Sequence, residues 1–132
     1  MEFEFNRDIK TRDEIIFGEY DEKKYHGGVR RFENLDLTAL EKLVDQKFID
    51  LEDAQNASPT VEEFLAFMKA YPDYTAHGYT VVNIDRNDYR VTLEGIGKNY
   101  EANDKEELKD FVKMFHSADE LCIDKTMYCW YD

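Results

Sequence analysis

Two segments with helical apolar spacing, both within residues 32–71, constrain the fold more than any other feature of the chain. The first follows Asp36, a residue type that commonly caps the N-terminus of a helix. Its apolar positions recur every three or four residues, at Leu37, Leu40, Leu43, Val44 and Phe48. The sequence therefore predicts an amphipathic helix over residues 37–48.

The second segment starts with Thr60 and Glu63, which have the spacing of a capping box. Its apolar positions are Val61, Phe64, Leu65, Met68 and Tyr71. Pro72 ends the pattern, because proline cannot continue a helix. A second helix is thus predicted over residues 60–71, joined to the first by a polar connection at 50–56.

Two further helices are predicted from similar signals. Thr11 and Glu14 have capping-box spacing ahead of a short apolar run that stops at Gly18. Asn103 is expected to cap a helix over residues 103–115, with a glutamate at the box position. Carboxylates near these helix starts, Asp13 among them, are expected to interact favourably with the helix dipole.

Strands are predicted where aromatic and β-branched residues gather or alternate. They cover residues 2–5, 79–84 and 89–94, with a turn at 85–88 and with Gly95 and Gly97 closing the last strand. Residues 20–31 contain a diglycine and are expected to form a loop.

The tail, residues 121–131, predicts a closing hairpin with its turn at Lys125 and Thr126. A symmetric register would place Cys122 opposite Cys129. The side chains expected to share one face of this hairpin are Leu121, Ile123, Tyr128 and Trp130.

This order of elements favours an α+β fold, with an antiparallel sheet of about four to five strands covered on one face by three to four helices. The length of 132 residues suits a single domain spanning 1–132. Only two prolines and six glycines are present, so no linker is expected.

The chain has 30 acidic and 17 basic residues, a net charge of −13. This charge should repel nucleic acid and anionic membranes and attract basic protein surfaces. Nine phenylalanines and nine tyrosines exclude the composition of a disordered acidic tail. The N-terminus does not resemble a signal peptide and no segment is apolar enough to span a membrane, so a cytoplasmic protein with reduced cysteines is expected.

The sequence contains no motif that identifies an enzyme. His26, His77 and His116 have no second histidine or cysteine at ligand spacing, and phosphate-loop, zinc-protease and nucleophile-elbow motifs are absent. We therefore predict no catalytic residue, no metal and no cofactor. An enzyme whose site is assembled from scattered residues stays open as an alternative, and a cavity lined by His77 or His26 with converging carboxylates would favour it.

The functional hypothesis comes from a shortage of positive charge. Between Lys47 and Arg86 there are seven acidic residues and one base, Lys69. A surface of mostly one sign steers partners of opposite charge toward it. The residues predicted to bind a basic partner are Asp50, Glu52, Asp53, Glu62, Glu63 and Asp73, with Tyr71 and Tyr74 as apolar anchors.

This interpretation requires the carboxylates after position 47 to gather into one continuous negative surface. Lysines from the N-terminal third dispersed among them would remove its basis. The simpler alternative is that acidity only keeps the protein soluble.

In size, acidity and lack of a catalytic motif, the chain resembles the small anti-restriction and anti-CRISPR inhibitors of mobile elements, which mimic DNA. That resemblance implies a partner with a nucleic-acid-binding groove, such as a nuclease or defence complex, and implies no individual site residue. A different interpretation is a self-associating or toxin–antitoxin-type module that uses exposed aromatic residues, Trp130 and Tyr131.

Overall fold

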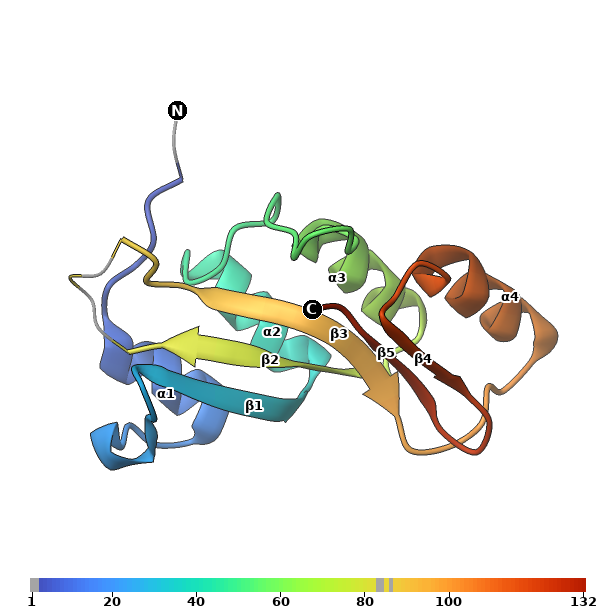
Figure 1. The fold of residues 1–132 in the computed structure, drawn as a ribbon, viewed down its shortest axis with the longest axis horizontal. Helices are drawn as coiled ribbons and strands as arrows, with labels where there is room; N and C mark the ends of the chain where they lie inside the picture. The colour runs from blue at the N-terminus through green and yellow to red at the C-terminus, as the bar shows by residue number, and fades with distance from the viewer. Residues whose placement is uncertain (1–2, 83–84, 86) are drawn as a thin grey trace.

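The computed structural model describes residues 3–82, 85 and 87–132 (Figure 1). These residues form α1 (Ile9–Phe17), the 3-10 helix η1 (Glu22–Lys24), β1 (Val29–Leu35), α2 (Leu37–Asp45), α3 (Val61–Ala70), β2 (Thr75–Val81), β3 (Val91–Lys98), α4 (Lys105–Phe115), β4 (Glu120–Ile123) and β5 (Met127–Trp130). The strands make one antiparallel sheet in the order β1-β2-β3-β5-β4. Helices α1, α2 and α3 lie behind this sheet in Figure 1, which confirms the predicted α+β fold.

Local capping signals place α2 and α3 where the sequence predicts them. The Asp36 side chain accepts a hydrogen bond from the Ala39 amide at 2.8 Å. Thr60 and Glu63 form the complete capping box, because each side chain accepts a hydrogen bond from the other residue's amide, at 3.2 and 3.0 Å. These bonds satisfy amides that have no partner within the helix.

The other two helices begin at different caps from those predicted. Asp8, not Thr11, caps α1, and its carboxylate accepts from the Thr11 hydroxyl at 2.7 Å. Asp104, not Asn103, caps α4 and accepts from the Glu107 amide at 2.7 Å. At each helix start two residues have side chains able to cap, Asp8 or Thr11 for α1 and Asn103 or Asp104 for α4. The apolar pattern alone does not decide between them.

Two strand predictions need correction at the N-terminal side. Of the predicted strand 2–5, residues 3–5 lie in no strand, and Glu2 lies outside the described residues. The Phe5 ring instead packs edge-on against the Tyr89 ring, with the ring centroids 6.3 Å apart. The segment predicted as a loop contains the start of β1, whose first residue Val29 pairs with Val81. Gly27 and Gly28 have positive φ values of 63° and 82°, so they form the turn that leads into this strand.

The central strands also differ in extent from the prediction. The predicted strand 79–84 is part of a longer β2 that starts at Thr75, and its last two residues lie outside the described chain, as does residue 86 of the predicted turn. Gly95 and Gly97 do not close β3 but lie inside it. A Cβ on Gly95 would lie 2.0 Å from the backbone oxygen of Cys129, so glycine is needed where β5 crosses closely.

The C-terminal hairpin has a register one residue away from the symmetric one. Cys122 pairs with Tyr128, and Leu121 pairs with Cys129. Because a shift of one residue exchanges the two faces of a strand, Cys129 is buried and Cys122 is exposed. The predicted Cys122–Cys129 pair and the predicted shared face are therefore wrong.

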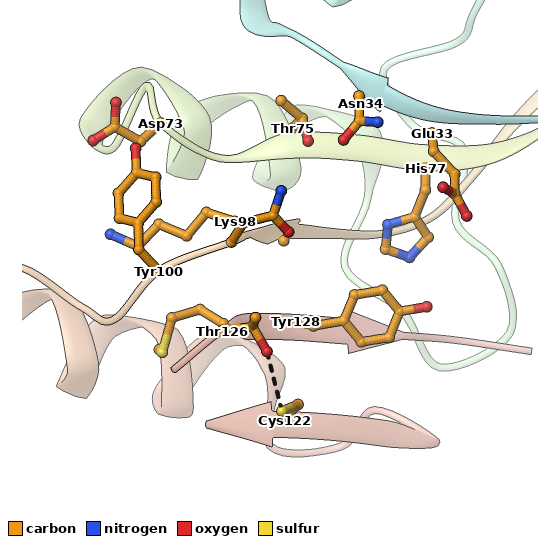
Figure 2. Close-up of a pocket in the computed structure, with 13 residues that line it drawn as sticks. Glu33, Asn34, Asp73, Thr75, His77, Lys98, Tyr100, Cys122, Thr126 and Tyr128 are labelled. Atoms are coloured by element: carbon orange, nitrogen blue, oxygen red, sulfur yellow. Dashed lines mark hydrogen bonds between the residues drawn. The ribbon is translucent and has the colours of Figure 1, made fainter. Parts of the chain in front are cut away.

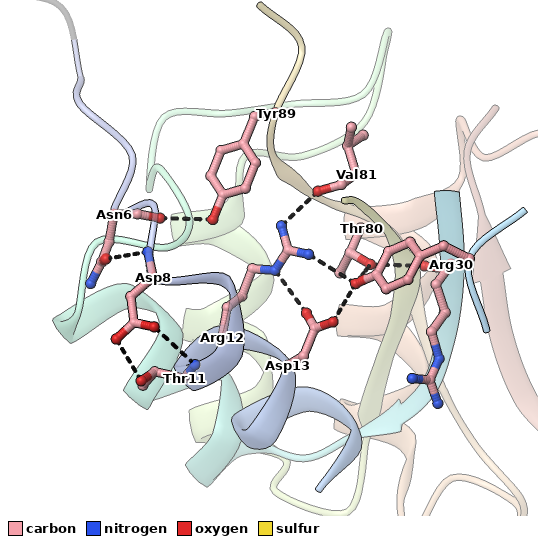
Figure 3. Close-up of polar contacts among 10 residues, drawn as sticks. Asn6, Asp8, Thr11, Arg12, Asp13, Arg30, Thr80, Val81 and Tyr89 are labelled. Atoms are coloured by element: carbon pink, nitrogen blue, oxygen red, sulfur yellow. Dashed lines mark hydrogen bonds and ion pairs between the residues drawn. The ribbon is translucent and has the colours of Figure 1, made fainter. Parts of the chain in front are cut away.

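A buried polar cluster fixes α1 to the sheet (Figure 3). The Arg12 and Asp13 side chains are fully buried and form an ion pair at 2.9 Å. Arg12 also donates to the backbone oxygen of Val81 at 2.8 Å and to the Tyr25 hydroxyl at 2.9 Å. Tyr25 donates to Asp13, and burial followed by this bond raises the pKa of Tyr25 to about 12. Asp13 is thus a core residue and not an exposed first-turn carboxylate.

Candidate functional site

Five of the six predicted carboxylates lie near the N-terminus of α3. The connection before this helix folds back on it, since the Val61 amide donates to the backbone oxygen of Asp53 and the Glu62 amide donates to that of Leu51, both at 2.9 Å. These bonds use amides that the first turn of a helix leaves unpaired. We call the resulting surface the acidic end: Asp50, Glu52, Asp53, Glu62 and Glu63.

The acidic end is poor in compensating positive charge. Within residues 3–82, 85 and 87–132, no lysine, arginine or histidine nitrogen lies within 4.0 Å of its carboxylates. Burial raises the pKa of Asp53, and the more distant Arg90 opposes this effect. Glu52, Glu62 and Glu63 are all exposed, but the Glu63 carboxylate is already hydrogen-bonded in its capping box. Glu52 and Glu62 are therefore the side chains best placed to meet a partner.

The other three predicted site residues lie at the opposite end of α3. At about 1.5 Å per helical residue, roughly 12 Å of helix separates Glu62 from the end of α3 at Ala70, and Asp73 lies beyond that end. Tyr71 is partly exposed, and its hydroxyl donates to Asp110 at 2.6 Å. That hydrogen bond, with burial, raises the pKa of Tyr71 to about 12. The structure therefore separates Asp73 and Tyr71 from the acidic end.

Tyr74 cannot be a surface anchor, because its side chain is completely buried. Its hydroxyl donates to Glu107 at 2.9 Å, and Glu107 forms an ion pair with Lys98. The Lys98 and Glu107 side chains are 1% and 2% exposed, so this pair belongs to the interior. The aromatic pattern that suggested an interface residue here reflects packing, since the Tyr74 ring lies 5.1 Å from that of Phe67.

Because Lys98 and Glu107 form a buried ion pair, we expect the folded protein to lose stability in acid. Burial by itself raises the pKa of Glu107, but hydrogen bonds from Lys98, Asn103 and Tyr74 outweigh it and hold the pKa below its ordinary value. A carboxyl with a lowered folded-state pKa stabilises the protein above its unfolded pKa, and this contribution disappears as pH falls through the folded value. The urea midpoint should therefore fall more steeply below pH 4.5 in the wild type than in Glu107→Gln, which cannot take up that proton. Equal slopes would contradict this role.

A cavity of about 450 Å³ opens on the sheet face opposite the core (Figure 2). Asp73, Lys98 and Tyr100 lie at one end of it, while Glu33, His77 and Tyr128 lie at the other. These side chains come from β1, β2, β3, β5 and the adjoining loops, so no short sequence motif connects them. The volume is within the range of small-ligand sites, about 300–1,000 Å³.

His77 and Tyr128 form the aromatic wall of this cavity. Their rings stack with centroids 4.8 Å apart and an angle of 12° between the planes. Gly95 makes room for them, since a Cβ there would lie 2.8 Å from His77 Nε2. Burial lowers the pKa of His77 to about 4, with the Cys129 backbone opposing this effect, so the imidazole is neutral at pH 7. Its buried Nε2 has no well-formed hydrogen bond to any described residue.

Comparison with known proteins found no matching family model, no matching curated protein and no matching solved structure. The functional proposal below is therefore based on the sequence and structure of this chain. In the described part of the chain, no helix has the length and apolar content of a membrane span, and no three His, Cys, Asp or Glu side chains group as metal ligands.

The cavity meets part of the condition stated for the enzyme alternative, because His77 lines it beside the Glu33 carboxylate, while the Asp73 carboxylate lies at the other end. Catalysis would need a nucleophile within hydrogen-bond reach of a base whose pKa is close to the working pH. The Cys122 thiol instead contacts the Thr126 hydroxyl at 3.4 Å, and the pKa of His77, about 4, is low for a base at neutral pH.

Proposed function

We propose that this chain is a protein-binding module whose acidic end occupies a basic, nucleic-acid-binding surface of a partner protein and thereby inhibits it. One observation carries the proposal: five carboxylates gather at one end of α3, and no base of the described chain lies within 4.0 Å of them. Like charges held together in this way cost self-repulsion, and they attract an oppositely charged surface.

The expected partner is a protein with a groove for nucleic acid, such as a nuclease or a defence complex. Duplex DNA presents one negative charge per roughly 1.7 Å of its axis, and proteins bind it largely through lysine and arginine contacts to phosphates. Glu52 and Glu62 project from a folded surface and can contact the same basic side chains. Because both are exposed, their main expected effect is on the rate and specificity of association.

The competing interpretation, self-association through exposed aromatics, needs different residues from those first considered. Tyr131 is 1% exposed and Trp130 is only partly exposed. Exposed apolar side chains occur instead on β4, which is an edge strand, where Leu121 and Ile123 are 37% and 41% exposed. An unpaired edge strand of this kind can pair with another chain.

Salt and DNA competition separate these two functions. The immobilised chain should capture a basic protein from an extract of its native host at about 50 mM salt and release it near 500 mM, since the screening length shrinks from more than 10 Å to a few Å. Duplex DNA added at constant ionic strength should also displace the captured protein. Capture that resists both treatments but is lost in Leu121→Ser/Ile123→Ser would contradict the acidic-end proposal and support the edge strand.

A further inference from the structure

We infer that the cavity on the open sheet face binds the guanidinium group of an arginine side chain. This inference rests on the proposed function, because a basic partner would supply the arginine. It assigns a second contact with that partner, on the sheet face away from α3. The observations that carry it are the charge of the cavity, its aromatic wall and the cation already held at its other end.

The charges around the His77–Tyr128 end of the cavity are mainly negative. Burial raises the pKa of the Tyr128 hydroxyl, and the charges of Glu120, Glu33 and Glu94 raise it further. Of these, Glu94 is paired with Arg31. Within the described ranges, no basic nitrogen lies within 4.0 Å of the Glu33 or Glu120 carboxylate. Arg31 also acts on His77, but it is paired with Glu94, so a cation entering here would meet the Glu33 carboxylate without a basic side chain beside it.

At the opposite end, the cavity wall itself holds a cation beside an aromatic ring. The Lys98 ammonium lies 4.9 Å from the Tyr100 ring centroid while it pairs with Glu107. That internal cation is part of the cavity wall at the Asp73 end, away from His77 and Tyr128 (Figure 2).

Arginine fits the His77–Tyr128 end better than lysine does. A guanidinium is planar and weakly hydrated, so it packs against aromatic rings such as Tyr128 and can form two parallel hydrogen bonds to one carboxylate, here Glu33. His77 is neutral at pH 7 and adds no opposing charge. The cavity volume of about 450 Å³ leaves room for the head and stem of one such side chain.

Blocked amino acids test this directly. N-acetyl-arginine methylamide, titrated into the full chain, should shift the amide resonances of Gly95, Gly97 and His77 at millimolar concentrations. N-acetyl-citrulline methylamide has the same shape without the charge and should bind at least about tenfold more weakly. Equal binding of the two compounds, or shifts confined to the acidic end, would overturn the inference.

Matched variants identify the carboxylate and the source of the arginine. Glu33→Gln should weaken binding of the arginine compound at least about fivefold, whereas Glu41→Gln, on α2, should leave it unchanged. Glu33→Gln should also reduce capture of the basic partner, and undiminished capture would overturn the assignment to a partner's side chain.

The variant Glu52→Lys/Glu62→Lys distinguishes failure of the acidic-end proposal from failure of the arginine-site proposal. This variant should bind the arginine compound normally, because both positions lie at the far end of α3. Loss of partner capture with normal arginine binding supports both proposals. Normal capture by this variant would overturn the acidic end while leaving the cavity result intact.

Discussion

Replacing Asp13 with alanine should lower the free energy of unfolding by about 3–5 kcal/mol, the usual cost of removing one partner of a buried ion pair. The substitution leaves the fully buried Arg12 guanidinium without its carboxylate. It also removes the acceptor of the Tyr25 hydroxyl, which joins the segment before β1 to α1. Among substitutions on α1, only those at Arg12, the other member of the pair, should cost as much.

Urea unfolding at pH 7, followed by circular dichroism, measures this effect. Glu14→Ala is the matched control, because Glu14 is the next residue of the same helix and is exposed. Its effect should stay within about 0.5 kcal/mol. The double variant Arg12→Met/Asp13→Leu should recover much of the loss, since it removes both charges together. A loss below 1 kcal/mol for Asp13→Ala would contradict the structural role of the pair.

The sequence predicts the features of this fold that depend on neighbouring residues. The caps of α2 and α3 each need only one side chain and an amide within three residues, so Asp36 and Thr60 are recognisable without the structure. Where two capping residues compete, as at Asn103 and Asp104, the local pattern is ambiguous. The β1 segment is equally hard to predict because three of its seven residues are charged.

Features that depend on residues far apart in the sequence were not predicted correctly. The hairpin register follows from a turn in which the Asp124 amide bonds the Thr126 carbonyl, and this turn exchanges the faces assumed for Cys122 and Cys129. Asp13 looks like any first-turn carboxylate until its contact with Tyr25 is known. Tyr74 is interleaved with acidic residues in the sequence, yet its burial follows from packing against α4.

The candidate site likewise has a part that the sequence predicts and a part that it does not. The gathering of Glu52 and Glu62 could be predicted, because a short connection links them and its backbone bonds the first turn of α3. The separation of Asp73 from Glu62 also followed from the sequence, because the helix predicted over residues 60–71 lies between them. The cavity was beyond prediction because Glu33, His77 and Tyr128 come from three strands and share no sequence pattern.

Reversing the charge of Glu52 and Glu62 should reduce capture of the basic partner at least about tenfold at low salt, because it changes the acidic end by four charge units. These two residues are chosen because they are exposed. Glu63→Lys would remove half of the capping box, and Asp53 is partly buried, so their reversal would confound binding with stability.

The most direct test compares Glu52→Lys/Glu62→Lys with Glu22→Lys/Glu101→Lys. Both variants change the net charge equally, and all four residues are exposed, but the second pair lies outside the acidic end. Partner capture should be lost in the first variant and retained in the second, with both showing the wild-type circular dichroism spectrum. Equal loss in the two variants would show that only total charge matters, and unchanged capture in the first would contradict the acidic end as the binding surface.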